Sequence, residues 1–293
     1  MHEHNANGRA FTLGMVVNTA YTVIELVVGT LIGSVSLVAD ALHNLSDVLS
    51  LGLAALANWL THKSPTVQRT YGLKGGSILA ALINAFILLI AMGAIIFEAF
   101  GRFAHPEPVS GGTVMLVAGI GILINGGTAL LFMKGRHGDL NVRGAFLHMA
   151  ADAGVSLAVV IAALIMSFTG WSWLDPLMSI LVAVVVVVAT WGLLRDAVNM
   201  ALAAVPRSVD ASEVAEVIRD YPTVRSFHDL HIWAISTTDT ALTVHLTRTT
   251  RADNDKFLAG LAEELRKKCT ISHITIQIEC GDYPELSSTD NNF

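Results

Sequence analysis

Long apolar stretches dominate the first two thirds of the chain. A helix needs about 20 apolar residues to cross a bilayer core of about 30 Å, and six stretches before residue 200 reach that length. They cover residues 11–32, 36–60, 77–100, 112–133, 144–168 and 173–194. The segments between them are short, so we expect an α-helical membrane domain of six transmembrane helices over residues 1–205.

The pattern changes after Pro206, where polar residues are interleaved with alternating apolar positions. Residues 208–221 and 253–268 are expected to form helices, and residues 224–235, 241–248 and 271–279 to form strands. This αββαβ order is typical of a small α+β, ferredoxin-like domain in which the helices cover one face of the sheet. We therefore predict a cytoplasmic domain over residues 206–293 that ends in a polar tail. Its modest core favours a dimer contact.

Basic residues indicate how the spans are oriented, because Lys and Arg of short loops are retained on the cytoplasmic side. Alternate loops place nine basic residues on one side and only Arg102 on the other. The nine are Arg9, Lys63, Arg69, Lys74, Lys134, Arg136, Arg143, Arg195 and Arg207. Both termini are therefore expected in the cytoplasm. No cleavable signal is expected, since the first apolar stretch has the length of a span and no small-residue cleavage site.

Composition agrees with a membrane protein and excludes several other classes. The chain is 53% hydrophobic and 14% charged, whereas average soluble chains are about 25% charged. A net charge of −6 without a basic run gives no electrostatic footprint for nucleic acid. Cys269 and Cys280 are the only cysteines, and we interpret them as reduced thiols on the cytosolic side.

Ionisable residues inside two of the apolar stretches are the strongest functional signal. His43 and Asp47 in the second stretch, and His148 and Asp152 in the fifth, form two His-x-x-x-Asp motifs. Positions i and i+4 share one face of a helix. Two such helices facing each other would present two imidazoles and two carboxylates, a set that suits tetrahedral zinc. The carboxylates would also balance the charge of one divalent ion.

The alternative is that these four residues are structural and satisfy one another between helices. An Asp at a helix centre costs about 2.5–3.5 kcal/mol on insertion scales, which favours a transport site over mere helix packing. Asp40 shares the stripe of His43 and could support the metal ligands or lie at the mouth of the ion path. Weaker cases are Glu25, Asn18, Asn84, Asn125 and Ser156, for which interhelical hydrogen bonds are favoured over a role on the path.

Three blocks of the sequence resemble the cation diffusion facilitators. They read GSVSLVADALHNLSD over residues 33–47, SFHDLHIW over residues 226–233 and HITIQIE over residues 273–279. The resemblance covers essentially the whole chain and is closest to the bacterial zinc, cobalt and cadmium exporters. It implies a homodimeric antiporter of the inner membrane that exports metal in exchange for protons, and no enzyme. The family's transport site corresponds to His43, Asp47, His148 and Asp152.

The resemblance also points to a metal site in the cytoplasmic domain, where His228, His245 and Glu279 match the family's positions. Polar residues on a sheet face are the alternative. Gln277, a poor zinc ligand, stands where some members have a histidine. A strand points residues 228 and 231 to opposite faces unless a bulge intervenes, so His228 and His231 are not expected to bind one ion together. His231 and His273 are runner-up ligands.

The segment after the second stretch departs from the family pattern. Many members have Tyr-Gly-x-x-basic-x-Glu there, whereas this chain reads YGLKGGS over residues 71–77. Lys74 is one position away from the expected basic residue, so the sequence does not decide whether this segment forms an interlocking ion pair with another part of the chain. No additional metal site is expected in this loop, because Gln68, Arg69 and Leu73 offer no suitable ligands.

The ligand types restrict the metal, and the spans restrict the class of protein. Imidazole and carboxylate suit zinc first, and also cadmium, cobalt and nickel, which the sequence does not rank. A passive metal channel or a membrane metal sensor would use the same four residues without proton coupling and stays an alternative. An intramembrane metalloenzyme is disfavoured, because the chain has no His-Glu-x-x-His motif and no spare glutamate beside the four residues.

Overall fold

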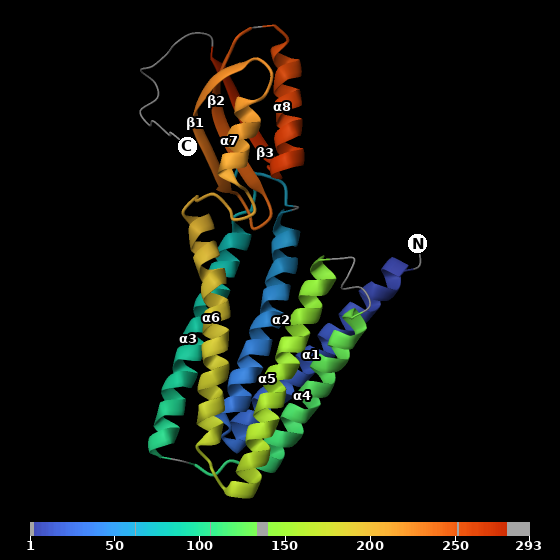
Figure 1. Cartoon of the computed structure of the whole chain (residues 1–293), viewed down its shortest axis with the longest axis vertical. Coiled ribbons are helices and arrows are strands. Elements are labelled where there is room, and N and C mark those ends of the chain that lie inside the picture. The colour runs from blue at the N-terminus through green and yellow to red at the C-terminus, as the bar shows by residue number, and fades with distance from the viewer. Residues whose placement is uncertain (1–2, 62, 106, 134–139, 251, 280–293) are drawn as a thin grey trace. The chain divides into compact units, whose positions relative to one another are not determined.

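The computed structural model describes residues 3–61, 63–105, 107–133, 140–250 and 252–279 (Figure 1). Cys280 and the predicted polar tail lie outside the described residues. The helices are α1 (Glu3–Ile32), α2 (Val35–Thr61), α3 (Gly76–Ala104), α4 (Gly111–Phe132), α5 (Leu140–Thr169), α6 (Leu174–Ala201), α7 (Ala211–Arg219) and α8 (Asn254–Cys269). The strands are β1 (Val224–Ala234), β2 (Thr240–Arg248) and β3 (His273–Glu279).

The chain divides into two compact units. The first contains Met1–Gly52 and Asn84–Trp191, and the second contains Leu53–Ile83 and Gly192–Phe293. The first unit therefore holds most of the helices predicted to span the membrane. The second unit holds the α2–α3 connection and everything from the end of α6 onward.

The long helices have the character of membrane spans. Judged on described residues, α3 to α6 each contain a stretch long and apolar enough to cross a bilayer, and α1 contributes a shorter apolar stretch, Val16–Ile32. Large apolar side chains such as Leu31, Phe97 and Phe168 are mostly exposed, which is unfavourable in water and favourable in lipid. The predicted class, a helical membrane region followed by a small α+β domain, is confirmed.

Helix α2 lies at the centre of the first unit. One buried cluster joins Leu37 of α2 to Tyr21 of α1 and to residues of α4 and α5. A second cluster joins Ala39 of α2 to Met92 of α3 and to residues of α6. Helices α4 and α5 run side by side (Figure 1), and they approach so closely at Gly111 that a Cβ there would lie 2.6 Å from Ser167 Oγ. This packing through small residues is common between membrane helices.

The start of α2 is held by a side chain from α6. Asp175 is buried and accepts hydrogen bonds from the Val35 backbone N–H at 2.9 Å, from Ser34 Oγ at 2.7 Å and from Ser36 Oγ at 2.5 Å. Gly33, with φ of +67°, makes the turn that brings α1 into α2. A carboxylate at a helix N-terminus satisfies free N–H groups and complements the helix dipole.

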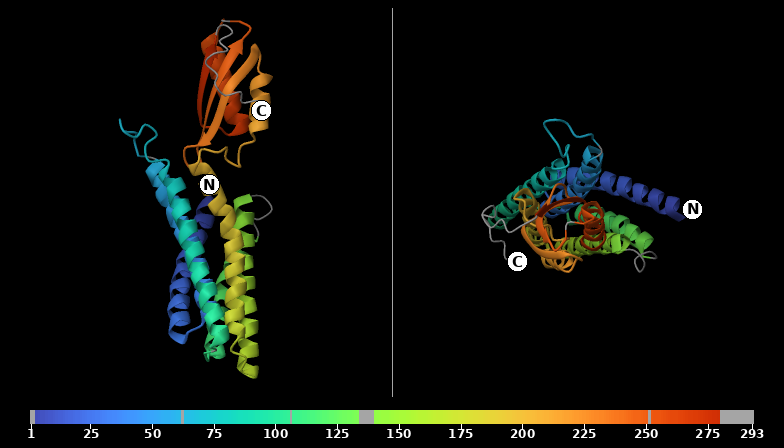
Figure 2. Two further views of the ribbon diagram at one scale, coloured as in Figure 1. Left: turned by 90° about the vertical axis from the view of Figure 1, so that its left-hand side faces the viewer. Right: turned by 90° about the horizontal axis from the view of Figure 1, so that it is seen from above.

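In the second unit, a three-stranded sheet has the order β1-β2-β3. Strands β1 and β2 are antiparallel, and β2 and β3 are parallel, with α8 as the crossover. Alternate residues of β2, namely Leu242, Val244 and Leu246, pack in one core with apolar residues of α7 and α8. Both helices therefore cover the same face of the sheet, which Figure 2 shows from a second direction. The predicted element order αββαβ is confirmed.

The segment between α2 and α3 contacts the β1–β2 turn within the second unit. Lys74 Nζ lies 3.0 Å from Asp239 Oδ2, and the Thr237 backbone N–H donates to Ser77 Oγ at 3.0 Å. The Tyr71 ring meets the His273 ring edge to face, with centroids 5.4 Å apart. Burial would raise the pKa of Asp239, but the hydrogen bond and charge of Lys74 outweigh this and hold the pKa below its usual value.

Candidate metal sites

The two His-x-x-x-Asp motifs meet between α2 and α5. Across the helices, His148 Nε2 lies 3.1 Å from Asp47 Oδ2, and His43 Nε2 lies 3.5 Å from Asp152 Oδ1. Within each helix, His43 lies 3.8 Å from Asp47 and His148 lies 3.7 Å from Asp152. Each imidazole therefore has a carboxylate on either side. We call these four residues the quartet.

The spacing of the quartet suits a metal ion. Ligand atoms of Asp47, His148 and Asp152 all lie within 4.8 Å of one another, and His43 contacts both carboxylates. A tetrahedral zinc with bonds of about 2.0–2.2 Å has ligand atoms about 3.3–3.6 Å apart. The nitrogen-to-oxygen distances of 3.1–3.8 Å bracket that value. A small closing movement would bring all four ligand atoms onto one ion.

The quartet is accessible from one end. The side chains of His148 and Asp47 are 42% and 31% exposed, whereas those of His43 and Asp152 are 17% and 4% exposed. Along α2 and α5, the exposed pair lies toward the end at which α2 finishes and α5 begins. An ion that enters from that end would meet Asp47 and His148 first.

Asp40 lies close enough to the quartet for its charge to act on His43 and Asp152, and its hydrogen bonds are with residues outside the quartet. It is buried, and Ser156 of α5 donates to its Oδ2 at 3.3 Å. Its carboxylate lies against that of Glu25, which accepts a 2.7 Å hydrogen bond from Tyr21 Oη. Among the weaker sequence candidates, Asn84 donates to Ser46 Oγ at 3.5 Å, which is an interhelical contact between α3 and α2.

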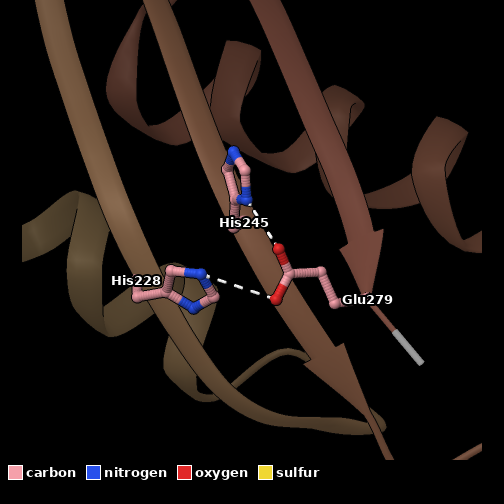
Figure 3. A group of neighbouring side chains, drawn as sticks. All are labelled: His228, His245 and Glu279. Atoms are coloured by element: carbon pink, nitrogen blue, oxygen red, sulfur yellow. Dashed lines mark hydrogen bonds and ion pairs between the residues drawn. The ribbon is translucent and has the colours of Figure 1, made fainter. Parts of the chain in front are cut away.

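A second cluster lies on the sheet face that the helices leave uncovered. His228, His245 and Glu279 come from β1, β2 and β3 and point toward one another (Figure 3). His245 Nδ1 lies 2.7 Å from Glu279 Oε1, and His228 Nε2 lies 3.5 Å from Glu279 Oε2. All three are partly buried. These residues bring two nitrogen ligands and one carboxylate together, which leaves a fourth position for water or another ligand.

A bulge in β1 shapes this cluster. The pairing of β1 with β2 shifts between His228 and His231, and Asp229 has a φ of +53°. Asp229 Oδ1 lies 2.9 Å from His231 Nε2, and its Oδ2 lies 3.7 Å from His245 Nε2. The sequence had not singled out Asp229, because alternation along a strand does not reveal a bulge. His231 pairs with Asp229 and His273 meets Tyr71, so neither belongs to the His228–His245–Glu279 cluster.

Comparisons with known proteins agree with this arrangement. Residues 11–200 match the model of the cation efflux transmembrane domain, and residues 206–280 match that of the cation efflux protein cytoplasmic domain. The chain is 34% identical over 285 residues to a Bacillus subtilis protein named as a cadmium, cobalt and zinc/H(+)-K(+) antiporter, covering 95% of this chain and 91% of that protein. It is 37% identical over 282 residues to the zinc transporter ZitB of Escherichia coli, covering 94% and 88%.

A solved structure, the metal-bound C-terminal domain of the CzcD transporter from Cupriavidus metallidurans, matches 25% of this chain and all of that domain at 42% identity, with a TM-score of 0.24. The matches over both parts of the chain show an integral membrane transporter of metal cations and not an enzyme. The chain belongs to the cation efflux family.

Proposed function

We propose that this chain exports zinc from the cytoplasm through the quartet. The observation that carries the proposal is the meeting of two imidazoles and two carboxylates inside α2 and α5, with nitrogen-to-oxygen distances of 3.1–3.8 Å. Two carboxylates balance the charge of a divalent ion, so the loaded site is neutral at membrane depth. The name of the Escherichia coli relative, a zinc transporter, supports zinc as the first substrate to test.

Proton exchange follows from the chemistry of the ligands. Zinc binds only deprotonated imidazole and carboxylate, so protons compete with the metal for His43 and His148. The same residues can then carry zinc outward and up to two protons inward. The Bacillus subtilis relative is named as an antiporter of protons and potassium, in agreement with this proposal.

The proposal also covers the membrane in which the protein lies and its oligomeric state. We propose a bacterial inner membrane as the location, and the distribution of basic residues in the sequence favours both termini in the cytoplasm. The exposed end of the quartet would then face the cytoplasm, where zinc is collected. We propose a homodimer joined through the cytoplasmic domain, since residues 206–280 match the cytoplasmic domain of cation efflux proteins. We also propose that His228, His245 and Glu279 bind zinc and regulate transport.

Transport in liposomes tests the zinc and proton parts together. The purified protein should release trapped zinc, and protons should move the opposite way. His148→Ala and Asp152→Ala should each abolish both fluxes, because the ion loses one of four ligands, while the protein still inserts. His231→Ala, outside the quartet, is the matched control. Zinc flux without counterflow of protons and without pH dependence would favour a passive channel, and normal zinc flux in either quartet variant would refute the site.

A further inference from the structure

The two ring nitrogens of His245 each face a different carboxylate. Nδ1 lies 2.7 Å from Glu279 Oε1 inside the His228–His245–Glu279 cluster, and Nε2 lies 3.7 Å from Asp229 Oδ2. Figure 3 shows that the second nitrogen points away from Glu279. A neutral imidazole carries a proton on one nitrogen and a lone pair on the other, and only the lone pair binds a metal. The tautomer of His245 therefore decides which side of its ring can bind an ion.

A bulge in β1 brings Asp229 to this position. His228 pairs with His245 and His231 pairs with Thr243, so three steps along β1 match two along β2. The extra residue places both histidines of β1 on the uncovered face of the sheet, and Asp229 adopts a φ of +53°. A positive φ is unfavourable for a residue other than glycine and persists only where the surroundings impose it. The strained backbone thus directs a carboxylate toward Nε2 of His245.

Asp229 is placed to orient His245 and not to bind the same ion. Ligand atoms of His228, His245 and Glu279 lie within 4.8 Å of one another, in a group that does not include Asp229. An ion bound at Nδ1 lies on a different side of the imidazole ring from Asp229. The other oxygen of Asp229 is occupied by His231, whose Nε2 lies 2.9 Å from Oδ1. Oδ2 therefore remains for His245.

We propose that Asp229 is a positioning residue for a zinc ion in this cluster, because it accepts the Nε2–H of His245 and leaves Nδ1 free to bind the ion. Histidines that bind metals nearly always donate their other N–H to a carboxylate, a carbonyl or water. The present separation of 3.7 Å is longer than a hydrogen bond, so Asp229 and His245 approach by about 0.7 Å when zinc binds. This role of Asp229 rests on the proposed zinc binding by His228, His245 and Glu279.

Without zinc, the ring proton of His245 is expected on the other nitrogen. An ionised carboxylate only accepts hydrogen bonds, so Nδ1 is the donor in the 2.7 Å contact with Glu279 Oε1. When zinc takes the lone pair of Nδ1, the proton of a neutral ring resides on Nε2, next to Asp229. Zinc binding therefore exchanges one tautomer for the other, with one proton released from Nδ1 to water and one taken up from water at Nε2.

Zinc titration of the full-length protein in a His148→Ala background, which removes zinc binding at the quartet, tests this role. Asp229→Asn tolerates the positive φ but offers an amide N–H to Nε2, which stabilises the unproductive tautomer. The zinc affinity should therefore fall about 10- to 100-fold. Asp229→Gly also suits the bulge and should lower the affinity through loss of the carboxylate. His231→Ala leaves Oδ2 in place and should not change the affinity.

Nitrogen-15 NMR of the histidine rings separates a positioning role from a merely structural one. In the background protein, His245, identified by the signals lost in His245→Gln, should carry its proton on Nδ1 without zinc and on Nε2 with zinc. Zinc affinity unchanged in both Asp229 variants, or an Nδ1–H in the zinc-loaded protein, would overturn the role of Asp229 alone. A background protein that binds no zinc would refute the cytoplasmic zinc site and the role of Asp229 with it.

Discussion

His43 is the more enclosed of the two quartet histidines and contacts both Asp47 and Asp152. Its ring lies 6.2 Å from that of His148, edge to face. Because a nitrogen ligand favours zinc over oxygen-loving ions, His43 is the position at which one substitution can change metal preference without removing a ligand.

His43→Asp should shift transport from zinc toward manganese. The site would then offer three carboxylates and one imidazole, with an additional negative charge. We expect the zinc-to-manganese flux ratio to fall about tenfold, which corresponds to about 1.4 kcal/mol. His105→Asp, an exposed histidine just after α3, introduces the same residue outside the site and serves as control. An unchanged ratio in H43D would contradict direct ligation by His43.

In the cytoplasmic domain, two neighbouring histidines should differ in their effect on zinc affinity. In a His148→Ala background, which removes zinc binding at the quartet, His245→Ala should lower the remaining zinc affinity at least about tenfold. His231→Ala should leave it unchanged, because His231 pairs with Asp229 outside the cluster. Calorimetry on the full-length protein measures both. Equal losses in the two variants, or no zinc binding in the background protein, would disprove the assignment.

At the residue scale, what the sequence could predict depends on periodicity. His43 and Asp47 share a helical face whatever the neighbouring helices do, so their pairing follows from spacing alone. The bulge at Asp229 requires a positive φ, which Asp tolerates better than most residues but which no local pattern announces. The contact between Glu25 and Asp40 joins two helices and depends on their packing, so the sequence could offer Glu25 only as an interhelical contact.

At the scale of elements, hydropathy predicted the helices well but stopped well short of the ends of two of them. The sixth apolar stretch stops at residue 194, whereas α6 continues to Ala201. Polar residues such as Arg195 and Asp196 end the apolar pattern but remain good enough helix formers to extend the helix. Likewise α1 begins at Glu3, before the first apolar stretch. The length of an apolar stretch therefore indicates how much of a helix lies in the bilayer, and not where the helix begins or ends.

The contact of Asp175 with the start of α2 predicts a large loss of stability on a small substitution. Asp175→Asn keeps the volume but places N–H groups against three donors, which leaves buried groups unsatisfied at a cost of about 1–3 kcal/mol. The melting temperature should fall by about 2–4 °C for each kcal/mol. Asp196→Asn is the control on the same helix, because Asp196 pairs with Arg207 at a half-exposed position. Equal melting temperatures would exclude a stabilising role for Asp175.

At the scale of the whole molecule, the contact between the α2–α3 segment and the cytoplasmic domain was only partly predictable. The sequence placed Lys74 one position away from the family's basic residue. It could not place Asp239, which lies in the β1–β2 turn 165 residues later and reaches Lys74 only through folding. Such pairings depend on long-range packing, and a short motif cannot specify them.

This contact should be insensitive to pH over the physiological range. The pKa of Asp239 lies below its usual value, so the ion pair contributes fully above about pH 4 and is lost only as pH falls through the lowered pKa. Hydrogen exchange of residues 71–77 should therefore be equally protected at pH 5 and pH 8, after correction for intrinsic rates. Asp239→Asn should speed it about 1.5- to 5-fold, as for a pair worth about 0.2–1 kcal/mol.

Lys63→Gln provides the control for that experiment. Lys63 lies in the same segment but stacks on the Trp59 ring, with Nζ 4.2 Å from the centroid. Its removal should not change the exchange of residues 71–77. Protection that disappears between pH 8 and pH 5 in the wild-type protein would contradict the role assigned to Asp239.

The unequal exposure of the quartet has a kinetic consequence for the ion. Zinc in water carries a shell of tightly held water molecules that it must shed to enter the site. With Asp47 and His148 at the open end and His43 and Asp152 enclosed, the proposed export would let protein ligands replace those waters in sequence. The ion would then not be stripped bare in a single step. Dehydration would be divided into smaller barriers, each compensated by a new bond before the next water leaves.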